Sequence, residues 1–511
     1  MAVKLFKKSR AAVNELQTPY QYLCAVKRKH KNRVLESVLV EDYAAEGKSI
    51  ARVDGKVVFI EGTVPGDVAD IMLSKSKKDW AEGRAVHFHS YSEKRVTPFC
   101  NHFGLCGGCK WQMLPYEQQL IYKQREVEQN LKRIGRIELP VMPTIIGSDA
   151  TQFYRNKLEF TFSNKRYLTK EEFLQRDEAR SKMETDLDGT NTLQAEVFDG
   201  ALGFHVPRVF DKAIDITTCY LQAEPSNAIR NFVRQFAIQH QYSFYDIRAH
   251  TGWLRTMIVR TTSNGQVMIN ITFGFDEEAN RNLLFDAMLN EFPSITTLLY
   301  TINPKWNDTI YDLQPQVYFG TGFITETLEN FTFKIGPKSF FQTNTKQAEQ
   351  LYKVTRSFAA LTGKEVLYDL YCGTGSIGIF CSAGAKKIIG VDAVEEAIIN
   401  AKENALMNGL SNTHFFAGDV LPICNDDFFA ANGRPDVIIT DPPRAGMHEK
   451  LVKKLLDIAA ARIVYVSCNT ATQARDLQLL NEKYRVEQLQ PVDLFPHTHH
   501  IENVAALTLR S

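Results

Sequence analysis

From about residue 331 onward, short apolar runs alternate with stretches of helical periodicity. The runs are Glu365–Asp369, Ile388–Asp392, His414–Phe416, Asp436–Thr440 and Ile463–Val466. Short continuous apolar runs are typical of parallel strands buried on both faces, and such strands need helical connections. The pattern therefore predicts a doubly wound α/β domain over 331–511, with ligands at the carboxyl ends of its strands.

A glycine-rich loop follows the first of these runs. Gly373, Gly375 and Gly378 match the pattern G-x-G-x-x-G, and Asp392 ends the second run 19 residues after Gly373. The glycines allow a tight turn close to a cofactor, and the carboxylate can bind ribose hydroxyls. Since NAD and S-adenosyl-L-methionine both present a ribose there, the loop alone does not distinguish them.

Two further segments follow strands at the same predicted rim. The fourth run leads into Asp441-Pro442-Pro443-Arg444, and two prolines directly after a strand force an irregular loop. The fifth run leads into Cys468. A lone buried cysteine is usually a small apolar filler, but its place at the rim favours a nucleophile. Because the thiolate is the attacking form, we expect the pKa of this thiol to be lowered.

Acid–base groups gather near the end of the sequence. His497, His499, His500 and Glu502 lie within six residues of one another. A carboxylate and imidazoles can act as general acids and bases. Their spacing matches no standard zinc motif, so we favour catalysis over metal binding.

The N-terminal part has a different texture. Between about Val34 and His87, short alternating runs are broken by glycines, which predicts a small β-barrel of the kind that often binds nucleic acid. A docking module is the alternative. Residues 1–40 carry nine Lys or Arg against two Glu, an excess that suits a polyanion or, equally, a solvated tail.

The middle of the chain begins with a cysteine cluster. Cys100, Cys106 and Cys109 crowd into ten residues of a chain that has nine cysteines. Apolar residues from Leu120 to Ile134 then recur at helical spacing, and Gly135 ends the predicted helix. Residues 152–330 mix strands and helices, and the strongly charged 165–196 reads as an exposed, partly helical insertion.

Composition narrows the protein class. Apolar residues make up 44% and charged residues 23%, as in ordinary globular proteins. No apolar run approaches the ~20 residues that span a bilayer, and the first residues lack the apolar core of a secretory signal. We therefore expect a soluble cytoplasmic protein without membrane contact, and disulfides are unexpected in that setting.

Four motifs in order make the sequence recognisable. They are F-x-Q-x-N at 340–344, D-P-P-R-x-G at 441–446, S-C-N-x-x-T at 467–472 and P-x-T-x-H-x-E at 496–502. Together they resemble the RNA 5-methyluridine methyltransferases, the TrmA/RumA-like family, although Thr470 stands where that family usually has proline. The N-terminal barrel resembles a TRAM domain, an RNA-binding module of the ribosomal-RNA branch.

The resemblance implies a domain organisation. A basic extension would occupy 1–33, a TRAM-like, OB-like barrel 34–95, a mixed α+β central domain 96–330, and a Rossmann-like methyltransferase domain 331–511. It also implies that Cys100, Cys106, Cys109 and Cys219 ligate a 4Fe–4S cluster. Four thiolates suit tetrahedral zinc as well, and their spacing does not decide between the two.

The resemblance also implies a chemistry. Cys468 would attack carbon 6 of a uracil, and Glu502, assisted by His500, would remove the proton from carbon 5. The methyl donor, S-adenosyl-L-methionine, would be held by six residues: Gln342, Tyr371, Ser376, Asp392, Asp419 and Asp441.

The expected partner is RNA, most simply 23S ribosomal RNA, with a tRNA T-loop uridine as the alternative. No obligate protein partner is expected. Two other classes compete with this interpretation: an NAD-dependent oxidoreductase, and a non-catalytic RNA-binding ribosome-assembly factor. The D-P-P-R loop and Cys468 argue against the first, and the intact pair Cys468 and Glu502 argues against the second.

Overall fold

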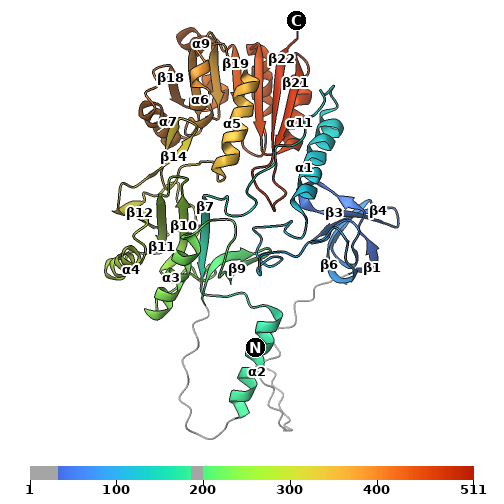
Figure 1. The fold of residues 1–511 in the computed structure, drawn as a ribbon, viewed down its shortest axis with the longest axis vertical. Helices are drawn as coiled ribbons and strands as arrows, with labels where there is room; N and C mark the ends of the chain where they lie inside the picture. Colours follow the sequence, from blue (N-terminus) through green and yellow to red (C-terminus); the bar gives the residue numbers. More distant parts are fainter. Residues whose placement is uncertain (1–32, 186–199, 511) are drawn as a thin grey trace, which may run out of the picture.

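The computed structural model describes residues 33–185 and 200–510. The predicted basic extension lies outside these ranges except for Arg33, and so does the end of the charged insertion. Figure 1 shows the C-terminal sheet in orange and red above a central sheet in green, with an N-terminal β module in blue beside them.

The C-terminal domain is built on one seven-stranded sheet. Its spatial order is β18 (Thr413–Ala417), β17 (Lys387–Asp392), β16 (Val366–Leu370), β19 (Val437–Thr440), β20 (Arg462–Ser467), β22 (Glu502–Leu509) and β21 (Tyr484–Val492). The first five strands are parallel and confirm the five predicted runs, whereas β22 is antiparallel to both of its neighbours. The sequence analysis did not predict the β21–β22 pair.

Helices cover both faces of this sheet. Leu367 packs into one apolar core with Leu351 of α5, while its neighbour Tyr368 packs into the other with Leu455 of α10. Successive residues of a strand point to opposite faces, so a continuous apolar run requires this double cover. The helices are α5 (Thr345–Ala359), α6 (Ser376–Phe380), α7 (Glu395–Met407), α8 (Val420–Ile423), α9 (Asp426–Asn432), α10 (Glu449–Ile458) and α11 (Thr470–Leu480).

The central domain has a second seven-stranded sheet. Its order is β13 (Gln316–Phe319), β12 (Ile295–Ile302), β11 (Val267–Phe273), β10 (Leu254–Thr261), β7 (Lys157–Ser163), β8 (Ala201–Val206) and β9 (Val209–Asp215). Helices α3 (Ser226–Gln239) and α4 (Glu278–Glu291) pack into its apolar core through Val233 and Phe285. The hairpin of β14 (Ile324–Leu328) and β15 (Phe331–Ile335) leads from this domain to the C-terminal one.

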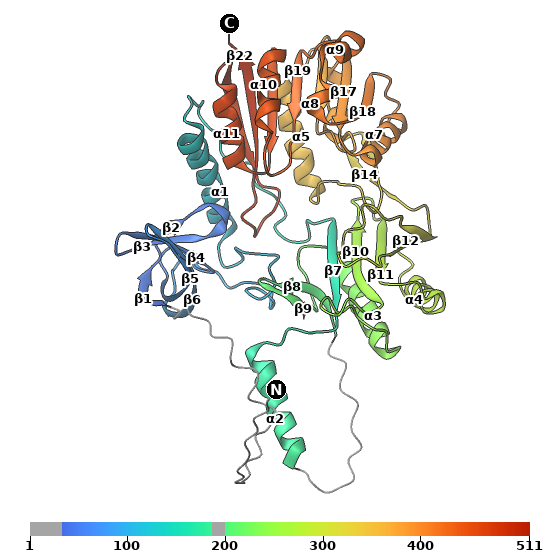
Figure 2. The same ribbon diagram turned by 180° about the vertical axis from the view of Figure 1, so that it is seen from behind.

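The charged insertion contains helix α2 (Lys170–Thr185), as the sequence predicted in part. Figures 1 and 2 show α2 projecting away from the rest of the molecule. Most of its described side chains are exposed, so it lies outside both cores.

The N-terminal module is one six-stranded sheet. Its order is β1 (Val34–Leu39), β5 (Val68–Ser76), β6 (Trp80–Ser90), β4 (Lys56–Glu61), β3 (Ser49–Val53) and β2 (Asp42–Tyr43). Residues from five of these strands, among them Val38, Ala51 and Ile71, share a single small core. A sheet that packs on itself in this way has the curled form expected of a small barrel.

Helix α1 (Tyr116–Asn130) links the N-terminal module to the C-terminal domain, through Arg125 with Asp42 and Lys123 with Asp493. It continues into a short π-helix at Leu131–Gly135, which packs on α11. The predicted helix ending at Gly135 is thus confirmed. Figure 2 shows α1 alongside α11, with the β21–β22 loop descending toward the cysteine segment. Among the described helices, none has both the length and the apolar character needed to cross a bilayer.

Candidate active site

The glycine-rich loop turns tightly at the carboxyl end of β16. Gly373 and Gly375 have φ of 53° and 77°, a region in which side chains are strained. The Gly373 N–H donates to Asp392 Oδ2 at 2.9 Å, and the Gly378 N–H donates to Asp369 Oδ2 at 2.8 Å. A Cβ on Gly373 would meet no atom within 4 Å, so the loop faces open space. The hydrogen bond from Gly373 shows that the glycine-rich loop and Asp392 are in contact, as the sequence predicted.

Three carboxylates gather at this rim. Burial raises the pKa of Asp369 to about 7, with Asp441 and Asp392 adding repulsion, and burial also raises the pKa of Asp441 to about 7. Asp369 Oδ1 is buried and has no hydrogen-bond partner. A set of close carboxylates fits a cationic sulfonium and is unsuited to the phosphates of a dinucleotide.

The other predicted donor-binding residues are arranged less uniformly. The Ser376 and Tyr352 hydroxyls hydrogen-bond at 3.0 Å. Asp419 is exposed and caps α8 by accepting from the Leu421 N–H. Gln342 is buried, and Tyr371 adopts a left-handed φ of 63° directly before the glycine loop.

Cys468 and Glu502 face each other across two strands. Ser467 of β20 pairs with Asn503 of β22 in antiparallel register. This places Cys468, directly after β20, opposite Glu502, the first residue of β22. Asn469, the residue after Cys468, caps the start of α11 with its side chain and so fixes the backbone next to the thiol. The predicted nucleophile and base, 34 positions apart in sequence, are thus neighbours in space.

The electrostatics at Cys468 contradict one expectation. Burial raises the pKa of the thiol to about 11, with Glu502 and Asp441 adding repulsion and Arg444 opposing them. The predicted lowering was wrong because burial and the acidic rim both disfavour a thiolate. The same burial and Asp441 raise the pKa of Glu502 well above its usual range.

Arg444 is a functional candidate to which the sequence analysis gave no role. Its Nη2 donates to His500 Nδ1 at 3.0 Å, and its charge favours the ionised forms of both Cys468 and Glu502. The Asn469 side chain donates to the Arg444 carbonyl, which ties the D-P-P-R loop to the start of α11. The conspicuous position of Arg444 directly after two prolines was the available signal.

The histidines of the β21–β22 loop are neutral. Burial lowers the pKa of His497 and His499 to about 4 and that of His500 to about 3. His500 is therefore a neutral imidazole near neutral pH, which accepts a hydrogen bond from Arg444 and is not a general acid there. The backbone carbonyl of His497 accepts from the N–H groups of Lys110 and Trp111, directly after Cys109.

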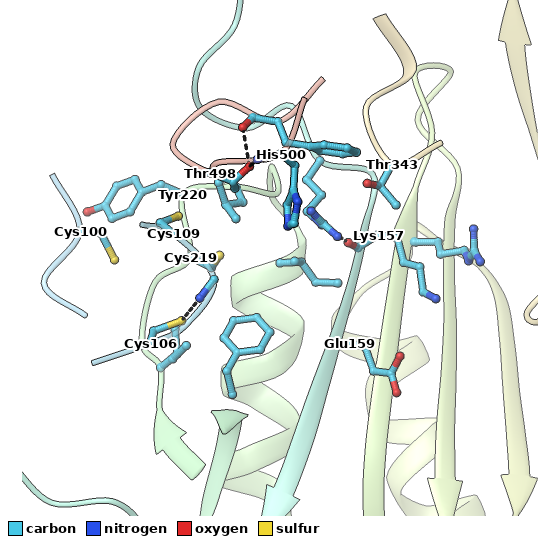
Figure 3. Close-up of a pocket in the computed structure, with 18 of the residues that line it drawn as sticks. Cys100, Cys106, Cys109, Lys157, Glu159, Cys219, Tyr220, Thr343, Thr498 and His500 are labelled. Atoms are coloured by element: carbon cyan, nitrogen blue, oxygen red, sulfur yellow. Dashed lines mark hydrogen bonds between the residues drawn. The ribbon is translucent and has the colours of Figure 1, made fainter. Parts of the chain in front are cut away.

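The four predicted cysteine ligands line one cavity of about 540 Å³. Figure 3 shows Cys100, Cys106, Cys109 and Cys219 gathered at one end, with His500 above and Lys157 at the other end. The Gly108 N–H donates to Cys106 Sγ at 3.4 Å. Within residues 33–185 and 200–510, no three His, Cys, Asp or Glu side chains are placed to hold one metal ion.

Family models match three parts of the chain. Residues 31–86 match the TRAM domain, 348–466 the methyltransferase small domain, and 427–510 the tRNA (uracil-5-)-methyltransferase family. An uncharacterized RNA methyltransferase of Bacteroides thetaiotaomicron is 52% identical over 91% of this chain and 100% of that protein. One from Porphyromonas gingivalis is 48% identical over 92% of this chain and 98% of that protein.

The chain belongs to the RNA uracil-5-methyltransferase family. A solved structure of a Pyrococcus abyssi tRNA (uracil-54, C5)-methyltransferase with S-adenosyl-L-homocysteine is similar to this RNA methyltransferase, with a TM-score of 0.68 and 26% identity. The match covers 92% of this chain and 100% of that one. The resemblance drawn from the four motifs, the fold class, the TRAM domain and the dependence on S-adenosyl-L-methionine are confirmed.

Proposed function

We propose that this RNA methyltransferase transfers a methyl group to carbon 5 of a uridine through a covalent bond between Cys468 and carbon 6. The observation that carries the proposal is the register of β20 and β22, in which Ser467 lies opposite Asn503. This register supports a nucleophile and a base acting on the same ring. The open glycine loop at the carboxyl end of β16, separated from β20 by β19, supports a methyl donor at the same rim.

The covalent step explains why a cysteine is needed. Carbon 5 of uracil is a poor nucleophile, and addition of a thiolate at carbon 6 makes it an enolate carbon. Bound S-adenosyl-L-methionine supplies an activated methyl group on a cationic sulfonium. Glu502 then takes the proton from carbon 5, the electron pair re-forms the ring double bond, and Cys468 leaves as a thiolate. The raised pKa of Glu502 makes its ionised form a stronger base.

Binding of the cationic methyl donor would also affect the protonation of Cys468. Burial, together with the charges of Glu502 and of Asp441 at the rim, holds the Cys468 thiol protonated. A sulfonium bound among these carboxylates would offset their charge and favour the thiolate. Arg444 acts in the same direction from the other side. We propose Gln342, Tyr371, Ser376, Asp392, Asp419 and Asp441 as the donor contacts.

For the substrate, we propose 23S ribosomal RNA. The support is the TRAM domain together with the four cysteines of the shared cavity, which the family resemblance associates with the ribosomal-RNA branch. A tRNA uridine is the second candidate, and one observation favours it: the similar Pyrococcus abyssi enzyme is a tRNA (uracil-54, C5)-methyltransferase. In either RNA the base has to leave its stack to reach the rim.

We propose that Cys100, Cys106, Cys109 and Cys219 hold a 4Fe–4S cluster. In such a cluster each thiolate would bind one iron, and the four cysteines line one shared cavity. The Gly108 N–H on Cys106 is the type of hydrogen bond that tunes such sulfurs. Zinc remains the rival, and iron, sulfide and zinc assays on anaerobically purified protein distinguish the two.

The test of function uses methyl-labelled S-adenosyl-L-methionine and unmodified total RNA. We expect label in 5-methyluridine of the 23S fraction, and none with Cys468→Ala. Cys424→Ala, which removes a buried thiol from the core behind the rim, should retain activity. Label in tRNA would overturn the proposed substrate alone, whereas label with Cys468→Ala would overturn the covalent mechanism.

A further inference from the structure

Two cations stand opposite each other on neighbouring strands of the central sheet. Lys157 of β7 pairs with Arg260 of β10 in antiparallel register. Both side chains line the cavity that Arg444 and His500 also line from the catalytic rim. Like charges directly opposite on adjacent strands destabilise a sheet, so this pair calls for a compensating group.

The protein itself provides little compensation. Arg260 is 3% exposed, and its guanidinium donates to the Ser339 carbonyl at 2.5 Å while its Nε has no partner. The Lys157 ammonium makes no hydrogen bond or ion pair with another residue in the described part of the chain. Glu159, on the same face of β7, is an exposed carboxylate whose charge favours the protonated forms of both cations without an ion pair to either.

A second buried arginine of β10, Arg255, has many more hydrogen-bond acceptors within the protein than Arg260 has. Arg255 donates to the carbonyls of Asn303, Lys305 and Asn307 and to the carboxylate of Asp308. Both terminal nitrogens of Arg255 have acceptors within the protein, although its Nε, like that of Arg260, has none. Arg260 lies five positions along the same strand, and its guanidinium has a single acceptor, the Ser339 carbonyl. It can therefore donate further hydrogen bonds to a bound ligand.

The chemistry of the missing partner follows from the groups present. Lysine and arginine offer donors and positive charge and no acceptor, so the partner is an anion. Burial and the facing Arg260 and Arg155 lower the pKa of Lys157, and a bound anion would reverse that effect. Figure 3 shows Lys157 at the end of the cavity away from the four cysteines, so a group held by their thiolates is not this anion.

We propose that Lys157 and Arg260 bind a backbone phosphate of the RNA, beside the nucleotide that enters the catalytic rim. The proposal deepens the proposed function and rests on it only in taking RNA as the substrate. Each phosphate neutralised by a protein cation releases condensed counterions. The site would therefore fix the register of the strand and add affinity without reading its sequence.

The test compares Lys157→Gln, Lys157→Arg and a matched control. Lys386→Gln removes an exposed lysine directly before β17. It lies at the amino ends of the parallel strands, opposite the catalytic rim. RNA affinity is measured against salt in a Cys468→Ala background, so that binding is read without turnover. We expect Lys157→Gln to lower the slope of log K against log salt by about 0.7 to 0.9 and to weaken binding about tenfold at low salt. Lys157→Arg should restore both values.

Turnover gives a second readout. In the active enzyme, Lys157→Gln should raise KM for RNA about tenfold and leave kcat within about twofold, because a phosphate contact is made equally in ground and transition states. The phosphate site is refuted if Lys157→Gln keeps the salt slope of Lys386→Gln, or if it loses iron while binding RNA normally. If wild type methylates no RNA but the slope still falls, the proposed reaction fails and the phosphate site stands.

Discussion

Lys123 and Asp493 form an ion pair of 2.6 Å in which both side chains are fully buried. Lys123 lies on α1, and Asp493 begins the loop that leads to Glu502. Lys123 also donates to the Phe495 carbonyl, and the Tyr116 hydroxyl donates to the second oxygen of Asp493. These bonds attach the β21–β22 loop to α1, so the geometry of the rim depends on a helix outside the C-terminal sheet.

Replacing Lys123 should therefore destabilise the protein strongly. Lys123→Met leaves the Asp493 carboxylate buried without a counter-ion, and we expect a loss of about 3–5 kcal/mol in the free energy of unfolding, measured with urea. Lys453→Met is the matched control, since its ion pair with Glu449 is exposed and screened by water, and its loss should be far smaller. Equal losses in the two variants would show that the buried ion pair contributes no more to the free energy of unfolding than the exposed one.

The acidic rim should make the ligand-free protein more stable at low pH. The pKa of Asp369 is raised to about 7 in the folded chain, above its unfolded value, so the folded state binds a proton that the unfolded state releases. This contribution to stability is complete below about pH 4 and is lost as pH rises to about 7.

Asp369→Asn removes that titration and keeps an oxygen for the Gly378 N–H. We expect the variant to unfold at a higher temperature than wild type at pH 8 without ligand, and to bind S-adenosyl-L-methionine more weakly. Calorimetry at pH 5 and pH 8 measures the first effect and titration with the donor the second. A variant less stable than wild type at pH 8 would contradict the argument.

Donor binding should activate Cys468. The thiol has a pKa of about 11 in the ligand-free chain, so its alkylation by iodoacetamide should still be accelerating above pH 9. S-adenosyl-L-methionine brings a positive charge to the rim and should shift this profile to lower pH. S-adenosyl-L-homocysteine fills the same space without that charge and should shift it less. Mass spectrometry of the Cys468 peptide follows the reaction, and identical profiles with both ligands would exclude an electrostatic cause.

Glu502→Gln should separate the two halves of the reaction. The variant keeps the shape of the side chain and cannot take the proton from carbon 5, so methylated uridine should stay bound to Cys468. Denaturing gels should show a protein–RNA adduct that wild type does not accumulate, with turnover reduced at least about a hundredfold. Normal turnover by Glu502→Gln would remove it from the role of base. His500→Asn should have a smaller effect, because His500 is neutral and only accepts from Arg444.

The sequence predicted the parallel strands and the rim residues because each is encoded locally. A continuous apolar run identifies a strand buried on both faces, and the residue after it falls at the carboxyl edge. The β21–β22 pair was missed since β21 contains Arg485, Glu487 and Pro491 among its apolar residues and does not read as a buried strand.

Electrostatic properties were less accessible from sequence. The raised pKa of Cys468 comes from burial and from the charges of Glu502 and Asp441, which follow or begin other strands. No local sequence pattern reports how close these groups lie to Cys468. Lys123 shows the same limit, because its neighbours Gln124, Arg125 and Glu126 suggest an exposed face of a helix. Its burial depends on a partner 370 residues away.

The place of β22 in its sheet has a consequence for synthesis. This strand lies between β20 and β21, yet the ribosome makes it after both. Until β22 emerges, the edges of β20 and β21 that it will join have unpaired backbone groups. If these two edges paired with each other, β22 would have no place in the sheet. Because β22 begins with Glu502, its arrival completes the sheet and delivers the proposed base in one event. A nascent chain is thus kept from performing the full reaction until this part of its fold is finished.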